Sequence, residues 1–105
     1  MDIADLFTPE ELAESRIEFL ERILTFYQDI EDIRERAKIV GHKIHGTGGN
    51  LGLNKFISDG IKLQLMVEND DEDNVILNTL NSLQKAVMEE LGSLRSSLSD
   101  ASPST

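Results

Sequence analysis

The sequence contains no cysteine and no tryptophan, and it has only one tyrosine, four phenylalanines and two prolines. The lack of cysteine excludes disulfides and zinc–thiolate sites. Because aromatic residues are scarce, any core must be mostly aliphatic. The hydrophobic residues, 39% of 105, are sufficient for the core of a single domain.

No stretch approaches the roughly 18 consecutive apolar residues that span a bilayer. The N-terminus also lacks the basic and apolar regions of a signal peptide, so we expect a cytoplasmic protein.

Basic residues are scarce as well, since 10 lysines and arginines stand against 20 acidic residues, for a net charge of −10. Such a chain is repelled by nucleic acids and by anionic membranes, and we expect it to bind neither. The charge is nevertheless uneven. Residues 33–67 contain six basic and two acidic residues, a net charge of +4, whereas the rest of the chain carries −14. A basic middle within an acidic protein points to one surface with an acidic partner.

Four segments show the three- and four-residue spacing of apolar side chains that is typical of helices, and none shows the alternation of a strand. The first begins at Thr8, where Pro9 and Glu11 complete a capping box. The second starts near Asp29 or Asp32 and runs into the glycine-rich residues 46–52. The apolar positions of the last three segments are Ile30, Ile33, Ala37, Val40 and Ile44; Leu53, Phe56, Leu63 and Val67; and Ile76, Leu80, Leu83, Val87, Leu91, Leu94 and Leu98.

Short connections between four amphipathic helices favour antiparallel neighbours. We therefore predict an all-α fold, an antiparallel up-down-up-down four-helix bundle over residues 1–98. A short N-terminal lead-in should pack Ile3, Leu6 and Phe7 onto the core. Residues 99–105 are small and polar, and we predict a disordered tail there.

The only two histidines, His42 and His45, lie in the second helical segment. At about 100° per residue, His42 points roughly 160° away from the apolar stripe of that helix, and His45 lies about 100° away. His42 should therefore be exposed to solvent, with His45 on the flank. A single exposed histidine is common at a protein surface, so position alone does not assign it a function.

The neighbours of His42 make it a candidate nucleophile. Ile39, one turn before it, also lies outside the apolar stripe, while Gly46 and Gly49 follow on the same face and leave the ring unshielded. A neutral imidazole is a competent nucleophile at physiological pH. Phosphoryl transfer requires in-line access and positive charge for the phosphoryl oxygens. That charge is available from three residues near His42, namely Lys38, Lys43 and protonated His45.

The run Gly41-His42-Lys43-Ile44-His45-Gly46-Thr47-Gly48-Gly49-Asn50-Leu51-Gly52 resembles the signature of histidine-containing phosphotransfer (HPt) domains. In that family the motif reads as a small residue, the phosphorylated His, any residue, an apolar residue, Lys, Gly, and then small residues leading to Asn-Leu-Gly. The family is a four-helix bundle of similar length with the phosphorylated histidine exposed on its second helix. The resemblance extends over roughly residues 8–98.

The resemblance implies a phosphorelay intermediate of two-component signalling. His42 would accept a phosphoryl group from a receiver-domain aspartate and pass it to the aspartate of another receiver. The implied partners are response-regulator receiver domains and a hybrid sensor histidine kinase, which would contact a monomer. Mg²⁺ would belong to the receiver, with no cofactor of the chain's own. No P-loop occurs, so we expect no ATP-dependent kinase activity. The residues that we expect to contact a receiver are Ile39, Gly46, Gly49, Arg34 and Lys55.

One position departs from the family pattern, because His45 stands where the family usually has lysine. A lysine is fully charged at neutral pH, whereas an ordinary histidine is mostly neutral. The departure leaves room for an alternative, a non-catalytic bundle that binds and sequesters a receiver or a kinase. A metal site formed by His42 and His45 is a weaker alternative, since two ligands are too few.

Overall fold

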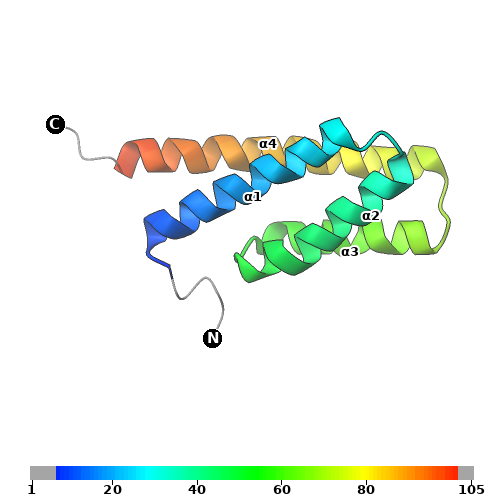
Figure 1. Ribbon diagram of the computed structural model, residues 1–105, viewed down its shortest axis with the longest axis horizontal. Helices are drawn as coiled ribbons and strands as arrows, with labels where there is room; N and C mark the ends of the chain where they lie inside the picture. Colours follow the sequence, from blue (N-terminus) through cyan, green and yellow to red (C-terminus); the bar gives the residue numbers. More distant parts are fainter. Residues whose placement is uncertain (1–6, 102–105) are drawn as a thin grey trace.

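The computed structural model describes residues 7–101, with side chains as far as Leu98. This part of the chain is all-helical and contains no strand, which confirms the predicted fold class at the level of four packed helices. The helices are α1 (Pro9–Asp29), α2 (Ile33–Lys43), α3 (Asn54–Glu68) and α4 (Asp73–Ala101), with a π-helical turn, η2 (Ile44–Gly48), directly after α2. In Figure 1 the chain reverses its direction along the long axis at each connection. Contacts are most extensive between α2 and α3 and between α1 and α4.

The start of each of the first two helices follows from its capping residue. At α1, Thr8 Oγ1 accepts from the backbone N–H of Glu11, and Glu11 Oε1 accepts from the backbone N–H of Thr8, as the capping box predicts. At α2 the cap is Asp32, whose carboxylate accepts from the N–H of Glu35. The earlier start near Asp29 is wrong, because Ile30 has an extended backbone and closes α1 instead of opening α2.

The glycine-rich segment does not end the second helix at its first glycine. The helix continues through η2 and one further α-turn before Gly52, which has a φ of 76°. There the N–H of Leu53 donates to Gly48 O (2.9 Å) and the N–H of Gly52 to Gly49 O (3.0 Å), the Schellman pattern of a helix end. A side chain at position 52 would meet the Arg16 guanidinium, whose Nε donates to Leu51 O (2.7 Å).

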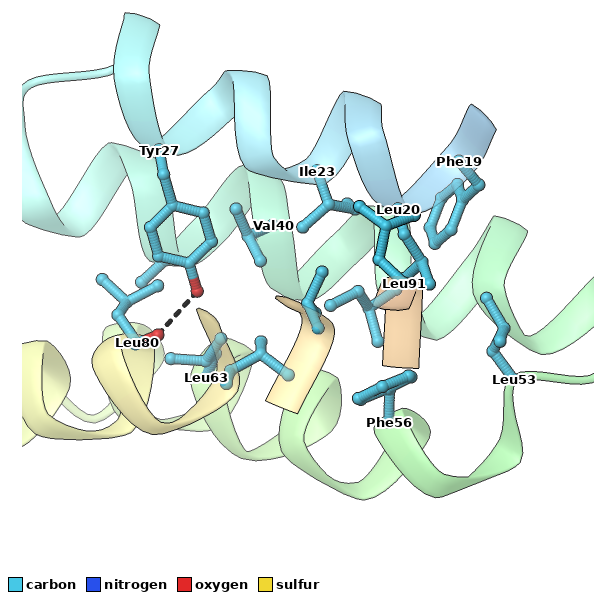
Figure 2. Close-up of a cluster of buried hydrophobic side chains, with 14 of the residues drawn as sticks. Phe19, Leu20, Ile23, Tyr27, Val40, Leu53, Phe56, Leu63, Leu80 and Leu91 are labelled. Carbon is cyan, nitrogen blue, oxygen red and sulfur yellow. Dashed lines mark hydrogen bonds between the residues drawn. The ribbon is translucent and has the colours of Figure 1, made fainter. Parts of the chain in front are cut away.

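The core is built from the apolar stripes of all four helices. In Figure 2, Leu20 and Ile23 of α1 lie opposite Leu63 of α3, and the Tyr27 hydroxyl donates to the Leu80 carbonyl at 2.7 Å. Among the residues that the structure describes, none of the polar or charged ones is buried. The buried apolar residues are Phe19, Leu20, Ile23, Tyr27, Ala37, Val40, Ile44, Leu51, Leu53, Phe56, Leu63, Met66, Ile76, Leu80, Leu83, Val87 and Leu91.

The two ends of the chain differ from the prediction or lie outside the described residues. α4 has 29 residues and continues to Ala101, so the start of the predicted tail, residues 99–101, is helical. The rest of that tail, residues 102–105, lies outside the described part, as do Ile3 and Leu6 of the predicted lead-in; Phe7 is half-buried. None of the helices in residues 7–101 has the length and apolar character needed to cross a membrane.

Candidate functional site

Two facing glycines bring α2 and α3 into close contact beside His42. A Cβ atom added at Gly41 would lie 2.8 Å from the carbonyl oxygen of Gly60, and one added at Gly60 would lie 3.0 Å from the carbonyl oxygen of Gly41. Real Cβ atoms essentially never come within 3.0 Å of another atom, so Gly41 requires glycine if the two backbones are to keep this separation, and a Cβ atom at Gly60 would make an unusually tight contact. The contact fixes the position of the last turn of α2, which carries His42, relative to α3.

His42 is exposed, as the helical spacing predicts, and its side chain lines a hollow of about 310 Å³. The other residues that line the hollow are Lys38 from α2 and Gln64, Val67 and Glu68 from α3. The imidazole is therefore accessible to a partner while standing next to a second helix that supplies polar and apolar groups.

His45 is exposed and is held by a side chain from α3. Its Nδ1 lies 3.2 Å from Oε1 of Gln64. A carboxamide oxygen only accepts, so the imidazole nitrogen must be the donor. With the proton on Nδ1, the Nε2 atom of His45 is left unengaged by this contact. Gln64 also lines the hollow beside His42, so the three side chains belong to one surface.

The remaining candidates on α2 lie on two sides of His42. Lys38 lines the hollow, on the side of α3. At about 100° per residue, Ile39 and Lys43 lie on the opposite flank of the helix. Lys43 is exposed, whereas Ile39 is only half-exposed. Among the ion pairs of residues 7–101, none involves Lys38 or Lys43, so both charges are available to a partner.

The two glycines expected to leave His42 unshielded differ from each other. A Cβ atom at Gly46 would have no other atom within 4 Å, so Gly46 borders open space as predicted. Gly49 is half-buried, and a Cβ atom there would contact Ile57 of α3 at 3.6 Å. Gly46 therefore leaves the space next to His42 open, while Gly49 is partly covered by α3.

Arg34 and Lys55, which the sequence suggests as receiver contacts, are engaged in ion pairs within the chain. Arg34 pairs with Asp70 (3.0 Å) and Asp73 (3.2 Å) and donates to the carbonyl oxygen of Asp71 (2.6 Å). Lys55 pairs with Glu90 of α4. Arg34 thus ties the start of α2 to the α3–α4 connection, and Lys55 ties α3 to α4. Their charges contribute less to the basic surface than the sequence alone indicates.

The comparisons with known proteins found no match. No protein-family model matches the sequence, and no curated protein and no solved structure is significantly similar to it. The residues that the structure describes also contain no group of three or more histidine, cysteine or acidic side chains arranged to hold a metal ion. The functional interpretation therefore depends on the residues and their geometry.

Three of the residues that line the hollow beside His42 are not among the candidate site residues that the sequence indicates. They are Gln64, Glu68 and Val67, the last of which belongs to the apolar stripe of α3 and is half-buried. The signal that could have found them is the Gly41–Gly60 pair, because facing glycines indicate which sides of two helices touch.

Proposed function

We propose that this protein is a phosphotransfer module of two-component signalling in which His42 carries the phosphoryl group between receiver-domain aspartates. The observation that carries the proposal is the exposed imidazole of His42 beside a hollow between two helices, with the unpaired charge of Lys38 in the same hollow. The resemblance of residues 41–52 to the HPt signature is independent support, since it selects the same histidine.

Phosphoryl transfer to His42 requires few groups from the protein itself. A neutral nitrogen of the His42 imidazole attacks the phosphorus of an aspartyl phosphate. The P–O bond to the aspartate breaks, an N–P bond forms, and the aspartate leaves as a carboxylate. The ring keeps its N–H proton and carries the positive charge, so atoms and charges balance without a further proton transfer. The same step runs in reverse with a second receiver. Mg²⁺ bound by the receiver would stabilise the phosphoryl oxygens.

The basic surface suits such a partner. Receiver active sites are built around aspartates, and complementary charge increases the rate of encounter and fixes orientation. Lys38 and Lys43 flank His42 on two sides of α2 and form no ion pair within the part of the chain that the structure describes. Ile39 and Gly46 complete the proposed contact surface, the first as a partly exposed apolar group and the second as open space.

The proposal includes a fold and a state of assembly. The four helices would form an antiparallel up-down-up-down bundle, which the reversal of direction at each connection supports (Figure 1). The protein would act in the cytoplasm as a monomer, because the face around His42 must stay free for receivers. A hybrid sensor histidine kinase would be the source of the phosphoryl group, through its own receiver domain.

The test is phosphotransfer from a radiolabelled receiver. The purified protein is incubated with phosphorylated receivers, and the label on this chain is followed with time and treated with acid and base. We expect a label that is stable in base and labile in acid, as phosphohistidine is, and no label in His42→Gln. A label that persists in His42→Gln would exclude the assignment. His45→Lys, which restores the usual family residue, should transfer as fast as the native chain or faster.

A second function, sequestration of a receiver without transfer, is favoured by two observations. The hollow beside His42 is lined in part by the acidic residue Glu68, and the position usually occupied by lysine holds His45. Both features reduce the positive charge available to a phosphoryl group. Stable receiver binding with no transfer of label, in the experiment above, would select this function.

A further inference from the structure

Two side chains of opposite charge line the hollow beside His42, and neither has an ion-pair partner. Lys38 comes from α2 and Glu68 from α3, and both residues are exposed. Among the ion pairs of residues 7–101, none involves either of them, so they do not pair with each other although they line one hollow. A partner that enters the hollow therefore meets one free positive charge and one free negative charge.

Contacts elsewhere in the fold explain why the carboxylate of Glu68 is not neutralised by Arg34. Arg34 lies one helical turn before Lys38, and its side chain reaches the α3–α4 connection just beyond Glu68. The guanidinium is already engaged there by the carboxylates of Asp70 (3.0 Å) and Asp73 (3.2 Å). The acidic residues that follow Glu68 thus take up the positive charge that could have paired with it.

The frame that carries the two charges is fixed on both sides of Lys38. On one side, Gly41 and Gly60 bring the two backbones so close that a Cβ atom at Gly41 would lie 2.8 Å from the Gly60 carbonyl oxygen. On the other side, Arg34 ties the start of α2 to the α3–α4 connection. Groups on such a fixed frame lose less conformational entropy on binding than groups on a mobile loop. The hollow therefore presents its two charges in a constant arrangement.

A pair of opposite charges discriminates between partners in a way that a uniformly basic surface does not. The net charge of +4 on residues 33–67 attracts any acidic partner. A partner with an acidic group opposite Lys38 and a basic group opposite Glu68 gains at both positions. A partner that is acidic at both positions gains at the first and is repelled at the second, and such repulsion is a common source of specificity.

We propose that Glu68 is a specificity-determining residue that selects, together with Lys38, the receiver that docks at His42. The selected receiver carries a basic side chain opposite Glu68 and an acidic one opposite Lys38. The inference rests on the proposed function, because the partner that it concerns is the receiver that exchanges its phosphoryl group with His42. Glu68 acts on the choice of partner, and its negative charge makes no favourable contact with the phosphoryl group itself.

The first test measures the rate of transfer from a phosphorylated receiver that serves the native chain. The variants are Glu68→Gln and Glu68→Lys. Glu89→Lys is the matched control, because Glu89 is exposed on α4, does not line the hollow and makes the same change in net charge. We expect transfer to be about fivefold slower in Glu68→Gln, the effect of one charge about 4 Å away in water, and slower still in Glu68→Lys. Glu89→Lys should transfer as fast as the native chain or faster.

The second test uses phosphoramidate, a small phosphoryl donor that requires no docked receiver. Removal of the carboxylate leaves more positive charge for the phosphoryl group, so phosphoramidate should label His42 faster in Glu68→Gln and Glu68→Lys than in the native chain. The two donors should therefore respond in opposite directions to the same substitution. A role of Glu68 in the fold alone would slow both reactions.

The third test is rescue by a change of charge in the receiver. Each basic residue on the surface of the receiver is replaced by glutamate in turn, and transfer to Glu68→Lys is measured. We expect one of these receiver variants to restore transfer to Glu68→Lys while losing transfer to the native chain. That reciprocal result would identify the receiver residue opposite Glu68.

The outcomes separate this inference from the function on which it rests. Transfer from the receiver that is as fast in Glu68→Lys as in Glu89→Lys would overturn the selection by Glu68 and leave the phosphotransfer function standing. Slower labelling of the Glu68 variants by both donors, or no rescue by any receiver variant, would also overturn it. Absence of label on His42 of the folded native chain from either donor would overturn the proposed function itself.

Discussion

The α1–α4 side of the molecule and the α2–α3 face around His42 use opposite means to hold two helices together. α1 and α4 meet through large buried side chains such as Leu20, Ile23 and Leu80, and their outer surfaces are acidic. α2 and α3 meet at Gly41 and Gly60, where backbone touches backbone, and residues 33–67 carry a net charge of +4. The first arrangement supplies stability, while the second keeps the His42 side chain exposed on a firmly positioned helix.

This difference predicts which substitutions should lower the free energy of unfolding and which should alter phosphotransfer. Changes in the α1–α4 packing should reduce the free energy of unfolding and affect phosphotransfer only through loss of folded protein. Changes on the α2–α3 face should alter phosphotransfer with little effect on unfolding, except at the two facing glycines, where packing and site coincide.

The largest effect on stability is expected for Leu80→Ala. Leu80 is fully buried in the core, and truncation of such a leucine costs about 2–5 kcal/mol through lost apolar contact and the cavity left behind. Met88→Ala is the matched control on the same helix, because Met88 is 58% exposed and should change stability by no more than about 0.5 kcal/mol. Urea unfolding measures both. Equal losses in the two variants would mean that α4 does not bury the stripe described above.

The next largest effect is expected from a comparison of Gly41 of α2 with Gly46 of η2. Gly41→Ala should destabilise the protein by about 1–2 kcal/mol, since the added methyl group would lie 2.8 Å from the Gly60 carbonyl oxygen and force the helices apart. Gly46→Ala adds its methyl group to open space and should leave stability unchanged or raise it by up to about 1 kcal/mol. Thermal unfolding checks both, and a stable Gly41→Ala would contradict the close contact of α2 and α3.

Substitution of Tyr27 should have a smaller effect on the free energy of unfolding, and that effect should depend on pH. Burial raises the pKa of Tyr27 well above the usual range of tyrosine. The contribution of the protonated phenol to stability is therefore complete below about pH 10 and is lost as the pH rises toward the folded-state pKa. Tyr27→Phe also removes the hydrogen bond to Leu80 O and should cost about 1 kcal/mol at neutral pH. Unfolding measured from pH 7 to 11 should show a steeper alkaline decline in the native chain than in Tyr27→Phe.

The smallest effect is expected at the start of α1. The backbone and side-chain hydrogen bonds to Thr8 lower the pKa of Glu11. A lowered carboxyl pKa stabilises the folded state above the usual pKa of glutamate, and this contribution disappears as the pH falls through the folded-state pKa. Glu11→Gln should therefore flatten the acid limb of the stability profile slightly and leave the alkaline limb unchanged. An identical acid limb in the two chains would argue against the capping box in solution.

The helices and the exposure of His42 follow from local sequence, whereas the composition of the site does not. The capping box at Thr8 and the apolar spacing depend on residues within one or two turns, so the sequence predicts them. Which charges remain free depends on distant partners, as the pairing of Lys55 with Glu90 and of Arg34 with Asp73 illustrates. The continuation of the second helix through η2 was not predicted. Glycine is unfavourable inside a helix, and the local sequence does not show the distant contacts that support this segment, such as the hydrogen bond from Arg16 to the Leu51 carbonyl.

The proposed phosphorylation of His42 is tested most directly by treating the protein with phosphoramidate and mapping any modification. Native protein and His42→Gln, both shown to be folded by circular dichroism, are labelled and analysed by mass spectrometry and by ³¹P nuclear magnetic resonance. We predict a single N-linked phosphoryl group on His42 in the native chain and no modification in His42→Gln. A native chain that remains unlabelled, or a label that maps to His45 and persists in His42→Gln, would contradict the proposed function.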